Sequence, residues 1–333
     1  MSSPLASTIR NNIGSFFCKL GTENVLYQNP SLRILFFSLG AGLVLKSALC
    51  WTKCLLSLFR PRFNLGARYG NGTWAVVTGA SDGIGKAFAF ELASRGFNIV
   101  LVSRTQEKLE LVAKALQYKY PAIQTRVIVA DFVNAAEENF AENIFEQVKD
   151  LDISILINNA GGFIKKPYLD ISTKEIRDLI VLNSLSHALV SRVFLPKMSA
   201  RDKKSAIINV SSIAGGFAQP HRQIYSASKG FLDYLSRGLS SEYPNIDILS
   251  VKPAYVITGM TSFRQPDTGA ITPEQLVEAS LNSLGRTTHT YGHWKHRVRG
   301  WFILGMPQWL RNIYIKNILM KQTNSPSQAA SSS

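Results

Sequence analysis

Short apolar segments alternate with longer segments of helical periodicity from residue 74 onward, and this alternation limits the fold of the 333-residue chain more than any other feature. Such alternation is typical of βαβ units, which build a parallel sheet covered by helices on both faces. The expected strands are 74–78, 98–102, 124–129, 153–157, 206–210 and 246–251. The expected helices are 85–95, 105–119, 135–149, 172–198 and 225–243. We predict a single Rossmann-like, doubly wound α/β domain that binds ligands at the carboxyl ends of its strands.

The charge of the chain is concentrated at its two ends. The net charge is +15, yet residues 1–74 hold eight Lys or Arg against one acid, and the residues after Glu278 hold seven against none. The stretch between them, with 22 basic and 21 acidic residues, is nearly neutral. A nucleic-acid-binding protein usually carries its basic surface on the folded domain, so we expect no nucleic acid partner. Basic ends beside apolar segments indicate an anionic membrane surface instead.

An apolar segment near the N-terminus is the candidate membrane anchor. Residues 34–52 form a run of 19 residues in which Lys46 is the only charge. A spanning helix needs about 20 apolar residues, and a helix lying in the interface is the alternative. Arg60, Arg62 and Arg68 follow the run, so a spanning helix would leave the large domain in the cytosol. We divide this region into an N-terminal segment (1–30), a membrane anchor helix (31–59) and a basic linker (60–73).

The C-terminal part of the chain is both basic and apolar. We expect the α/β domain to cover residues 74–285 and an extension to follow over 286–321. Trp, Tyr, Arg and Lys mix with Leu and Ile in residues 301–320, which indicates an amphipathic helix at a membrane interface or a cap on the domain's core. Residues 322–333 lack aromatic residues and are expected to be disordered. Residues 259–270 are expected to form a mobile loop over the substrate.

No metal site is expected. All three cysteines precede residue 75, which excludes a disulfide framework and a cysteine-based zinc site in the α/β domain. His289, His293 and His296 have helix-like spacing, but no carboxylate or thiol accompanies them. His221, four residues before Tyr225, is interpreted as a partly exposed loop residue.

A glycine-rich turn follows the first expected strand. Gly79, Gly83 and Gly85 let the backbone turn tightly and approach a pyrophosphate at the positive end of the next helix. The second strand ends in Arg104, where NAD-binding proteins usually place an acid that holds the ribose hydroxyls. An arginine can pair with a 2′-phosphate instead, which favours NADPH over NADH.

The spacing of three polar residues carries the strongest signal for chemistry. Ser212 lies just past the fifth strand, Tyr225 follows thirteen residues later, and Lys229 comes four residues after Tyr225. Tyr and Lys at this spacing share one face of a helix. A nearby cation stabilises phenolate and moves the tyrosine pKa from about 10 toward neutrality. A serine hydroxyl can donate a hydrogen bond where oxyanion charge develops.

The chain resembles the short-chain dehydrogenase/reductase family through a set of motifs within residues 74–260. They are TGASDGIG (78–85), NNAG (158–161), Asn183, Ser212, YSASK (225–229) and PAYVIT (253–258), with Ala254 where the family often has Gly. The resemblance implies that Tyr225 is the general acid and that Lys229 lowers the pKa of Tyr225 and holds the nicotinamide ribose. It also implies that Ser212 hydrogen-bonds the carbonyl oxygen of the substrate and that Asn183 supports a water molecule of the proton relay. The implied catalytic residues are Asn183, Ser212, Tyr225 and Lys229. The implied cofactor-binding residues are Gly79, Ser81, Asp82, Gly83, Ile84, Gly85, Arg104, Asp131, Asn159, Ala160, Gly161, Tyr225, Lys229, Pro253, Val256 and Thr258.

The layout of the chain is similar to one membrane-bound branch of that family, which contains very-long-chain 3-oxoacyl-CoA reductases and 17β-hydroxysteroid dehydrogenases of the type 3 and type 12 kind. This similarity implies NADPH-dependent reduction of a 3-oxoacyl-CoA in fatty-acid elongation, with a ketosteroid as the alternative substrate. It also implies the endoplasmic reticulum membrane, with the catalytic domain facing the cytosol, and homodimerisation. A non-catalytic NADPH-binding scaffold or sensor is the alternative from another class.

Overall fold

The computed structural model describes residues 29–58, 64–259 and 269–323. The chain separates into two compact units, Met1–Pro61 and Arg62–Ser333, and each is described by itself. Most of the expected N-terminal segment 1–30, most of the loop 259–270 and most of the tail 322–333 lie outside the described residues.

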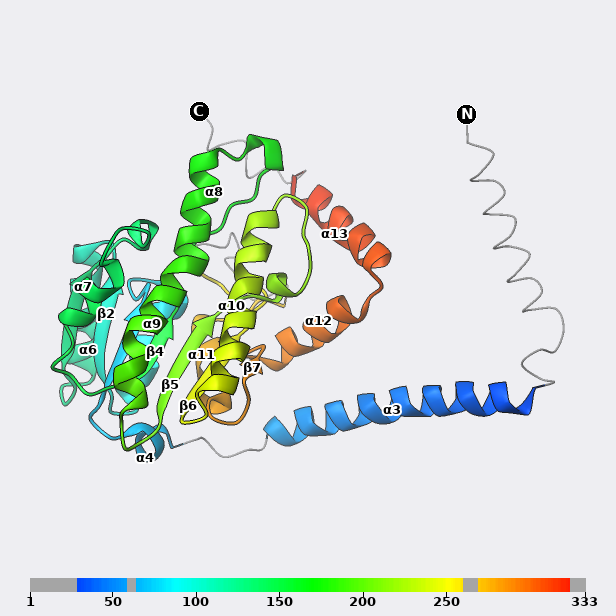
Figure 1. Ribbon diagram of the computed structural model, residues 1–333, viewed down its shortest axis with the longest axis horizontal. Coiled ribbons are helices and arrows are strands. Elements are labelled where there is room, and N and C mark those ends of the chain that lie inside the picture. The colour runs from blue at the N-terminus through cyan, green and yellow to red at the C-terminus, as the bar shows by residue number, and fades with distance from the viewer. Residues whose placement is uncertain (1–28, 59–63, 260–268, 324–333) are drawn as a thin grey trace. The chain divides into compact units, whose positions relative to one another are not determined.

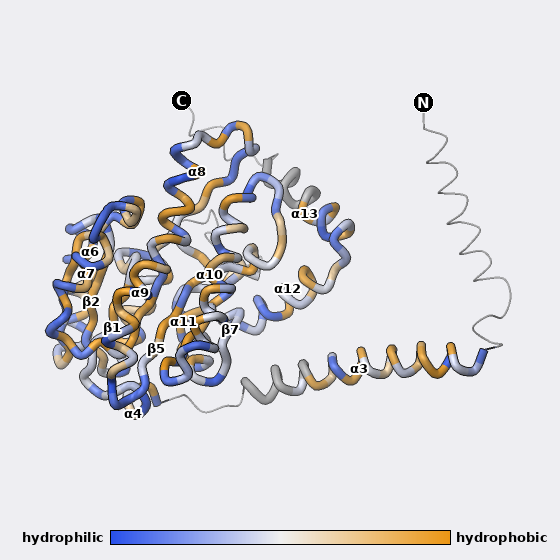
Figure 2. Tube along the Cα trace, in the orientation of Figure 1, coloured by the Kyte–Doolittle hydropathy of each residue, from blue (hydrophilic) through white to orange (hydrophobic). Residues whose placement is uncertain are grey.

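One long helix, α3 (Pro30–Leu58), makes up the described part of the first unit. Its first twenty residues, Pro30–Leu49, have a mean hydropathy of 1.7, and none of this segment is buried. Phe37 is 80% exposed, and the tube in Figure 2 shows apolar residues along the helix. An uncovered apolar helix of this length is a candidate membrane span. It overlaps the segment 31–59, whose role as a membrane anchor remains a prediction.

Seven strands of the second unit form one parallel sheet in the order β3-β2-β1-β4-β5-β6-β7 (Figure 1). The strands are β1 (Trp74–Thr78), β2 (Asn98–Ser103), β3 (Thr125–Val129), β4 (Ile153–Asn158), β5 (Ser205–Val210), β6 (Ile246–Val251) and β7 (His289–Thr290). The six predicted strands are confirmed to within one residue at each end. The strand order reverses between β1 and β4, which is where doubly wound sheets bind their ligands.

Helices cover both faces of the sheet. The helices of this unit are α4 (Leu65–Tyr69), α5 (Gly83–Ser94), α6 (Gln106–Lys119), α7 (Phe140–Glu146), α8 (Thr173–Ile180), α9 (Ser186–Ser199), α10 (Gln223–Glu242), α11 (Pro273–Ser283), α12 (Trp294–Gly305) and α13 (Gln308–Thr323). Side chains alternate between the faces, so Val77 packs in the core under α5, α6 and α11, whereas Val76 packs in the core under α7 and α9. The predicted Rossmann-like α/β fold is confirmed.

Two predicted helices differ from the observed ones. The segment 135–149 contains only α7, because Asn139 adopts a left-handed conformation with φ of 59° and starts a new helix there. The segment 172–198 begins at the capping box formed by Ser172 and Glu175, as predicted. It then passes through a π-helical turn, Val181–Leu185, before it continues as α9. Such turns insert one residue into a helix and occur frequently at functional sites.

Both segments that flank the predicted domain contribute to its core. Within the expected linker 60–73, α4 buries Leu65 and Tyr69. Arg68 and Tyr69 bind the Asp247 carboxylate of β6. Within the expected extension 286–321, β7 adds a seventh strand beside β6, which two residues of sequence could not reveal.

Candidate active site

The glycine-rich turn leads directly from β1 into α5. Gly79 and Gly83 have φ of +63° and +55°, a region that side chains rarely adopt. A Cβ on Gly85 would lie 2.2 Å from the carbonyl oxygen of Gly79, so only glycine fits there. Asp82 caps α5 by accepting a hydrogen bond from the Gly83 N–H over 2.7 Å. The turn therefore presents bare backbone and a helix N-terminus, which together suit a pyrophosphate.

The ends of β2 and β3 form one flank of this turn. The hydroxyls of Ser81 and Ser103 lie 3.1 Å apart, and the neighbouring Arg104 is exposed. Asp131 caps the short helix after β3 by accepting from the Val133 N–H. Ile84 is partly buried against the core. The exposed Arg104 guanidinium leaves a basic group beside the turn, where a 2′-phosphate could pair with it.

The segment after β4 is tied to the glycine turn. Thr78 Oγ1 accepts from the backbone N–H groups of Asn159 and Ala160. Asn159 donates its side-chain amide to the carbonyl oxygens of Thr78 and Gly79. The Asn159 side chain thus holds the turn, whereas Ala160 and Gly161 line the strand edge with backbone.

Asn183 lies inside the π-helical turn and is fully buried. Its Oδ1 accepts from the Gly162 N–H, and its Nδ2 donates to the Gly162 carbonyl oxygen and to Ser228 Oγ. The Ser228 hydroxyl donates in turn to the carbonyl oxygen of Tyr225. Asn183 therefore joins the loop after β4 to the first turn of α10.

Tyr225 and Ser212 face each other from α10 and from the end of β5. Burial raises the pKa of Tyr225, while hydrogen bonding with Ser212 and the charge of Arg222 act to lower it. Ser212 caps the short helix η4 (Ile213–Gly216), accepting from the Ala214 N–H over 3.1 Å. The Tyr225 ring packs edge-on against Phe163, 5.0 Å between centroids. This packing holds the phenol in one orientation.

Lys229 is buried one helical turn after Tyr225. Its Nζ donates to the Val210 carbonyl oxygen over 2.9 Å and lies 6.0 Å from the centre of the Tyr225 ring. Burial lowers the pKa of Lys229 to about 8. We expected Lys229 to pull the pKa of Tyr225 toward neutrality. In this structure burial raises the pKa of Tyr225 instead, and hydrogen bonding with Ser212 and the charge of Arg222 offset only part of that effect.

The segment after β6 closes the other side of the turn. The Pro253 carbonyl oxygen accepts from the Ile213 N–H over 3.0 Å, and Val256 is buried and pairs with Ile271. A Cβ on Gly83 would lie 3.1 Å from Thr258 Cγ2, so Thr258 sits against the start of α5. The structure therefore brings the predicted residues of strands β1, β4, β5 and β6 to one edge of the sheet.

His187 belongs to this site, and our sequence analysis missed it. It lies on α9, fully buried, and its Nε2 donates to the Ala160 carbonyl oxygen over 2.7 Å. Burial and the nearby Lys229 charge lower the pKa of His187 to about 3, so the ring is neutral. Among the residues that the structure describes, none gives its Nδ1 a hydrogen-bond partner. The signal was available, because His187 follows Asn183 at a spacing of four and shares its helical face.

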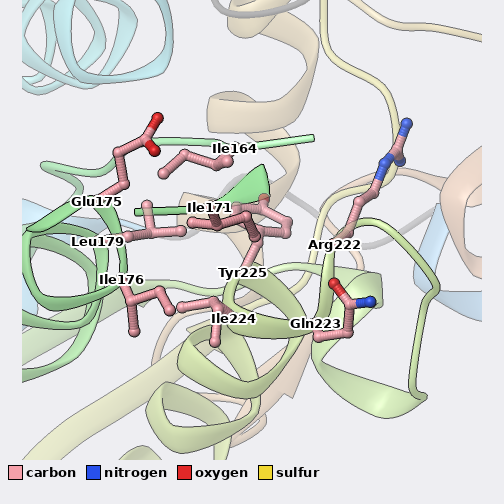
Figure 3. Close-up of a pocket in the computed structure, with 9 residues that line it drawn as sticks. All are labelled: Ile164, Ile171, Glu175, Ile176, Leu179, Arg222, Gln223, Ile224 and Tyr225. Atoms are coloured by element: carbon pink, nitrogen blue, oxygen red, sulfur yellow. The ribbon is translucent and has the colours of Figure 1, made fainter. Parts of the chain in front are cut away.

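A narrow crevice adjoins Tyr225. Figure 3 shows five aliphatic side chains gathered around it, with Glu175 and Arg222 at its periphery. The aliphatic residues are Ile164, Ile171, Ile176, Leu179 and Ile224. The Arg222 guanidinium stacks on Phe163 at 5.0 Å. An apolar crevice beside a half-buried phenol suits a hydrophobic substrate.

The described residues contain no group of three or more His, Cys, Asp or Glu that could hold a metal ion. What they do place together is a phenol, a serine hydroxyl, a buried amine and a backbone cradle for phosphates. A half-buried phenol beside a hydroxyl can deliver a proton to a carbonyl oxygen bound between them.

Comparisons with known proteins agree with this geometry. A family model described as short chain dehydrogenase matches residues 73–269. Very-long-chain 3-oxoacyl-CoA reductase-B of Danio rerio is 41% identical over 258 residues, covering 75% of this chain and 81% of that protein. Inactive hydroxysteroid dehydrogenase-like protein 1 of Homo sapiens is 41% identical over 249 residues, covering 72% and 74%. A structure titled short-chain dehydrogenase from Sphingobium yanoikuyae in complex with NADPH has a TM-score of 0.58 at 28% identity, covering 63% of this chain and 84% of that one.

Proposed function

Because this chain belongs to the short-chain dehydrogenase/reductase family, and is therefore an oxidoreductase acting on a CH–OH or C=O group, we propose that it reduces a very-long-chain 3-oxoacyl-CoA to the 3-hydroxyacyl-CoA. The observation that carries the proposal is the assembly of Asn183, Ser212, Tyr225 and Lys229 at one sheet edge, beside an aliphatic crevice. The relative of Danio rerio, which is 41% identical, supplies the substrate class.

The proton step is assigned to Tyr225. In this proposal Ser212 and Tyr225 hold the substrate carbonyl oxygen, and the phenol donates its proton as negative charge develops there. Burial raises the pKa of Tyr225, so the phenol is protonated at neutral pH and ready to act as an acid. Lys229 then returns a proton from its ammonium group to the Tyr225 phenolate. Asn183 orients the loop after β4, which borders the Lys229 amine.

A nicotinamide dinucleotide fits the cradle of this site. Gly79, Gly83 and Gly85 have no Cβ that would meet the protein atoms packed against the turn, so the turn can fold tightly at the point where α5 begins. The bound nucleotide supplies the hydride that reduces the carbonyl carbon. We assign the 2′-phosphate of NADPH to the exposed Arg104, since a guanidinium pairs well with phosphate. Ser81, Asp131, Thr258 and the backbone of Ala160 would border the nucleotide.

Attachment to a membrane completes the proposal. α3 offers an exposed apolar segment of 20 residues, Pro30–Leu49, and a long acyl chain partitions into bilayers. The basic residues that follow α3 favour the cytosolic side for the reductase unit. We propose the endoplasmic reticulum as the membrane, as for the branch that the sequence resembles.

A second candidate function rests on one comparison. A relative that is 41% identical bears the name of an inactive hydroxysteroid dehydrogenase-like protein, so a non-catalytic role in NADPH binding is a distinct hypothesis. The phenol, hydroxyl, amine and amide of this site are all present and connected, which favours catalysis.

The proposal is tested by NADPH oxidation with the full-length protein in detergent. A long-chain 3-oxoacyl-CoA and a 17-ketosteroid are offered separately. We expect turnover of the acyl-CoA. Turnover of the steroid alone would assign the site to steroids. NADPH binding without turnover of either substrate would support the non-catalytic role.

A further inference from the structure

Two helices near the C-terminus expose large aromatic side chains. Trp294, Trp301 and Phe302 of α12 and Trp309 of α13 are each more than 50% exposed. Three of the five tryptophans of the chain thus lie on these two helices. Soluble surfaces rarely present so many large aromatic groups together unless they bind something apolar. We call these four side chains the aromatic surface.

The opposite side of α12 is already occupied by the reductase unit. His296 is fully buried, accepting from the Ala254 N–H over 3.2 Å and donating to the Tyr255 carbonyl oxygen over 3.0 Å. Ile303 is buried, and a Cβ on Gly300 would lie 2.7 Å from the Tyr291 ring. Packing against the core therefore accounts for one apolar face of α12, whereas the aromatic surface is additional to it.

The charged residues of α12 and α13 themselves are all basic. Lys295, Arg297, Arg299 and Arg311 lie on the same two helices, and no acidic residue follows Glu278. Tryptophan combined with Lys and Arg is the composition of helices at the boundary between lipid headgroups and acyl chains. A second copy of this chain would bring the same positive charge to the contact, which opposes self-association there.

We propose that α12 and α13 form a second membrane contact, which inserts the aromatic surface into the headgroup region of an anionic bilayer. This contact is separate from the anchor helix α3, and it rests on the proposed function only in that the chain works at a membrane. The occupant is a lipid surface, because basic groups meet lipid phosphates while the aromatic rings reach the acyl boundary.

The proposed contact adjoins two segments that follow strands of the candidate site, η4 after β5 and the segment after β6. A Cβ on Gly216 of η4 would lie 2.8 Å from Leu304 of α12, and the Arg311 guanidinium lies 5.5 Å from the Phe217 ring. On the cofactor side, the Arg299 guanidinium lies 4.5 Å from the Tyr255 ring. Lipid bound by α12 and α13 would therefore lie beside the segments that follow Ser212 and β6, so that an acyl substrate could pass from bilayer to site.

The test measures fluorescence of single-tryptophan variants of the full-length protein in nanodiscs of phosphatidylcholine and phosphatidylserine. Brominated acyl chains quench tryptophans that enter the bilayer. One variant retains Trp301, a second retains Trp309, and a third retains Trp51 of α3, with the other tryptophans changed to Phe. The matched control changes all five to Phe and adds Tyr118→Trp, because Tyr118 is a fully accessible aromatic of α6.

We expect Trp301 and Trp309 to be quenched, and more weakly in nanodiscs of pure phosphatidylcholine, while the Tyr118→Trp control is not. Quenching of Trp51 alone would overturn the second contact and leave the proposed anchor standing. Quenching of Trp301 and Trp309 without Trp51 would support the second contact and count against the anchor. Emission equal to that of the control at all three positions would contradict both.

Discussion

Asn183 and Gly162 exchange two hydrogen bonds, 2.8 Å from the Gly162 N–H to Asn183 Oδ1 and 3.0 Å from Asn183 Nδ2 to the Gly162 carbonyl oxygen. One turn later on the same helical face, His187 donates to the Ala160 carbonyl oxygen. The loop after β4 is thus fixed by side chains of the helix that crosses it. A Cβ on Gly161 would lie 3.4 Å from Lys229 Nζ, so this loop also sets the space above the buried amine.

Substitution of His187 should show whether its hydrogen bond to Ala160 holds the loop after β4 in place. His187→Leu removes the donor to Ala160 and leaves a buried carbonyl oxygen without a partner, which costs about 1–3 kcal/mol. We expect a lower thermal midpoint together with a raised KM for NADPH. His187→Gln can place an amide N–H near the position of Nε2 and should recover most of both. Equal loss in the Gln and Leu variants would contradict the hydrogen-bonding role.

Arg104 should decide which nucleotide is used. Arg104→Asp removes the proposed partner of the 2′-phosphate and adds repulsion, so kcat/KM should fall about 10- to 100-fold with NADPH and much less with NADH. Lys108→Asp makes the same charge change at an exposed position of α6. It should leave the ratio of kcat/KM with NADPH to kcat/KM with NADH unchanged. Steady-state kinetics with both nucleotides measure the ratio, and equal losses with the two would remove Arg104 from the phosphate site.

The pH profile should report the ionisation of Lys229. Burial lowers the pKa of Lys229 to about 8, so the ammonium loses its proton as the pH rises through that value. If the cation returns the proton to Tyr225, kcat/KM for reduction should fall above about pH 8. Arginine keeps its charge throughout this range, so Lys229→Arg should be slower but flat between about pH 7 and 9. A wild-type profile that stays flat to pH 10 would exclude this role.

The contacts of the Asp247 carboxylate with Arg68 and Tyr69 of α4 should stabilise the fold to an extent that depends on pH. Burial raises the pKa of Asp247, but hydrogen bonds from Arg68 and Tyr69 outweigh it, and the pKa is lowered. A carboxyl with a lowered folded-state pKa stabilises the fold above its unfolded pKa of about 4, and this contribution is lost as the pH falls further.

Asp247→Asn should therefore lower the free energy of unfolding by about 1–3 kcal/mol at pH 7, with the difference from wild type narrowing below about pH 4. Asp150→Asn is the control, because Asp150 pairs with Arg126 at the surface and its loss should have no measurable effect. Chemical unfolding in detergent at several pH values measures both. An Asp247→Asn effect independent of pH would show that the carboxylate charge is not responsible.

Much of the fold could be predicted, because its determinants are local. The strands from 74 to 251 are short apolar runs between turns, and hydrophobic runs of that kind identify buried parallel strands without tertiary information. The strand β7 is only His289–Thr290, and it is defined by its pairing with β6 rather than by its own residues. The break at Asn139 likewise depends on one left-handed residue inside an otherwise helical pattern.

The residues of the candidate site could be predicted from the sequence, but the contacts between them could not. Glycine spacing and the positions of Ser212, Tyr225 and Lys229 follow from the chain and from the family resemblance. The contact of Lys229 with the Val210 carbonyl oxygen, and the burial that raises the pKa of Tyr225, depend on packing between distant segments. His187 was missed because a histidine on an apolar helical face has many other uses.

We propose that Tyr225 supplies the proton in reduction of a 3-oxoacyl-CoA, and removal of its hydroxyl tests this role. Turnover and NADPH binding are compared in wild type and Tyr225→Phe, both full-length and in detergent, with a long-chain 3-oxoacyl-CoA as substrate. Loss of a general acid predicts a fall of about 100- to 10,000-fold in kcat with NADPH affinity unchanged. Turnover by the Phe variant within a few fold of wild type would contradict the claim.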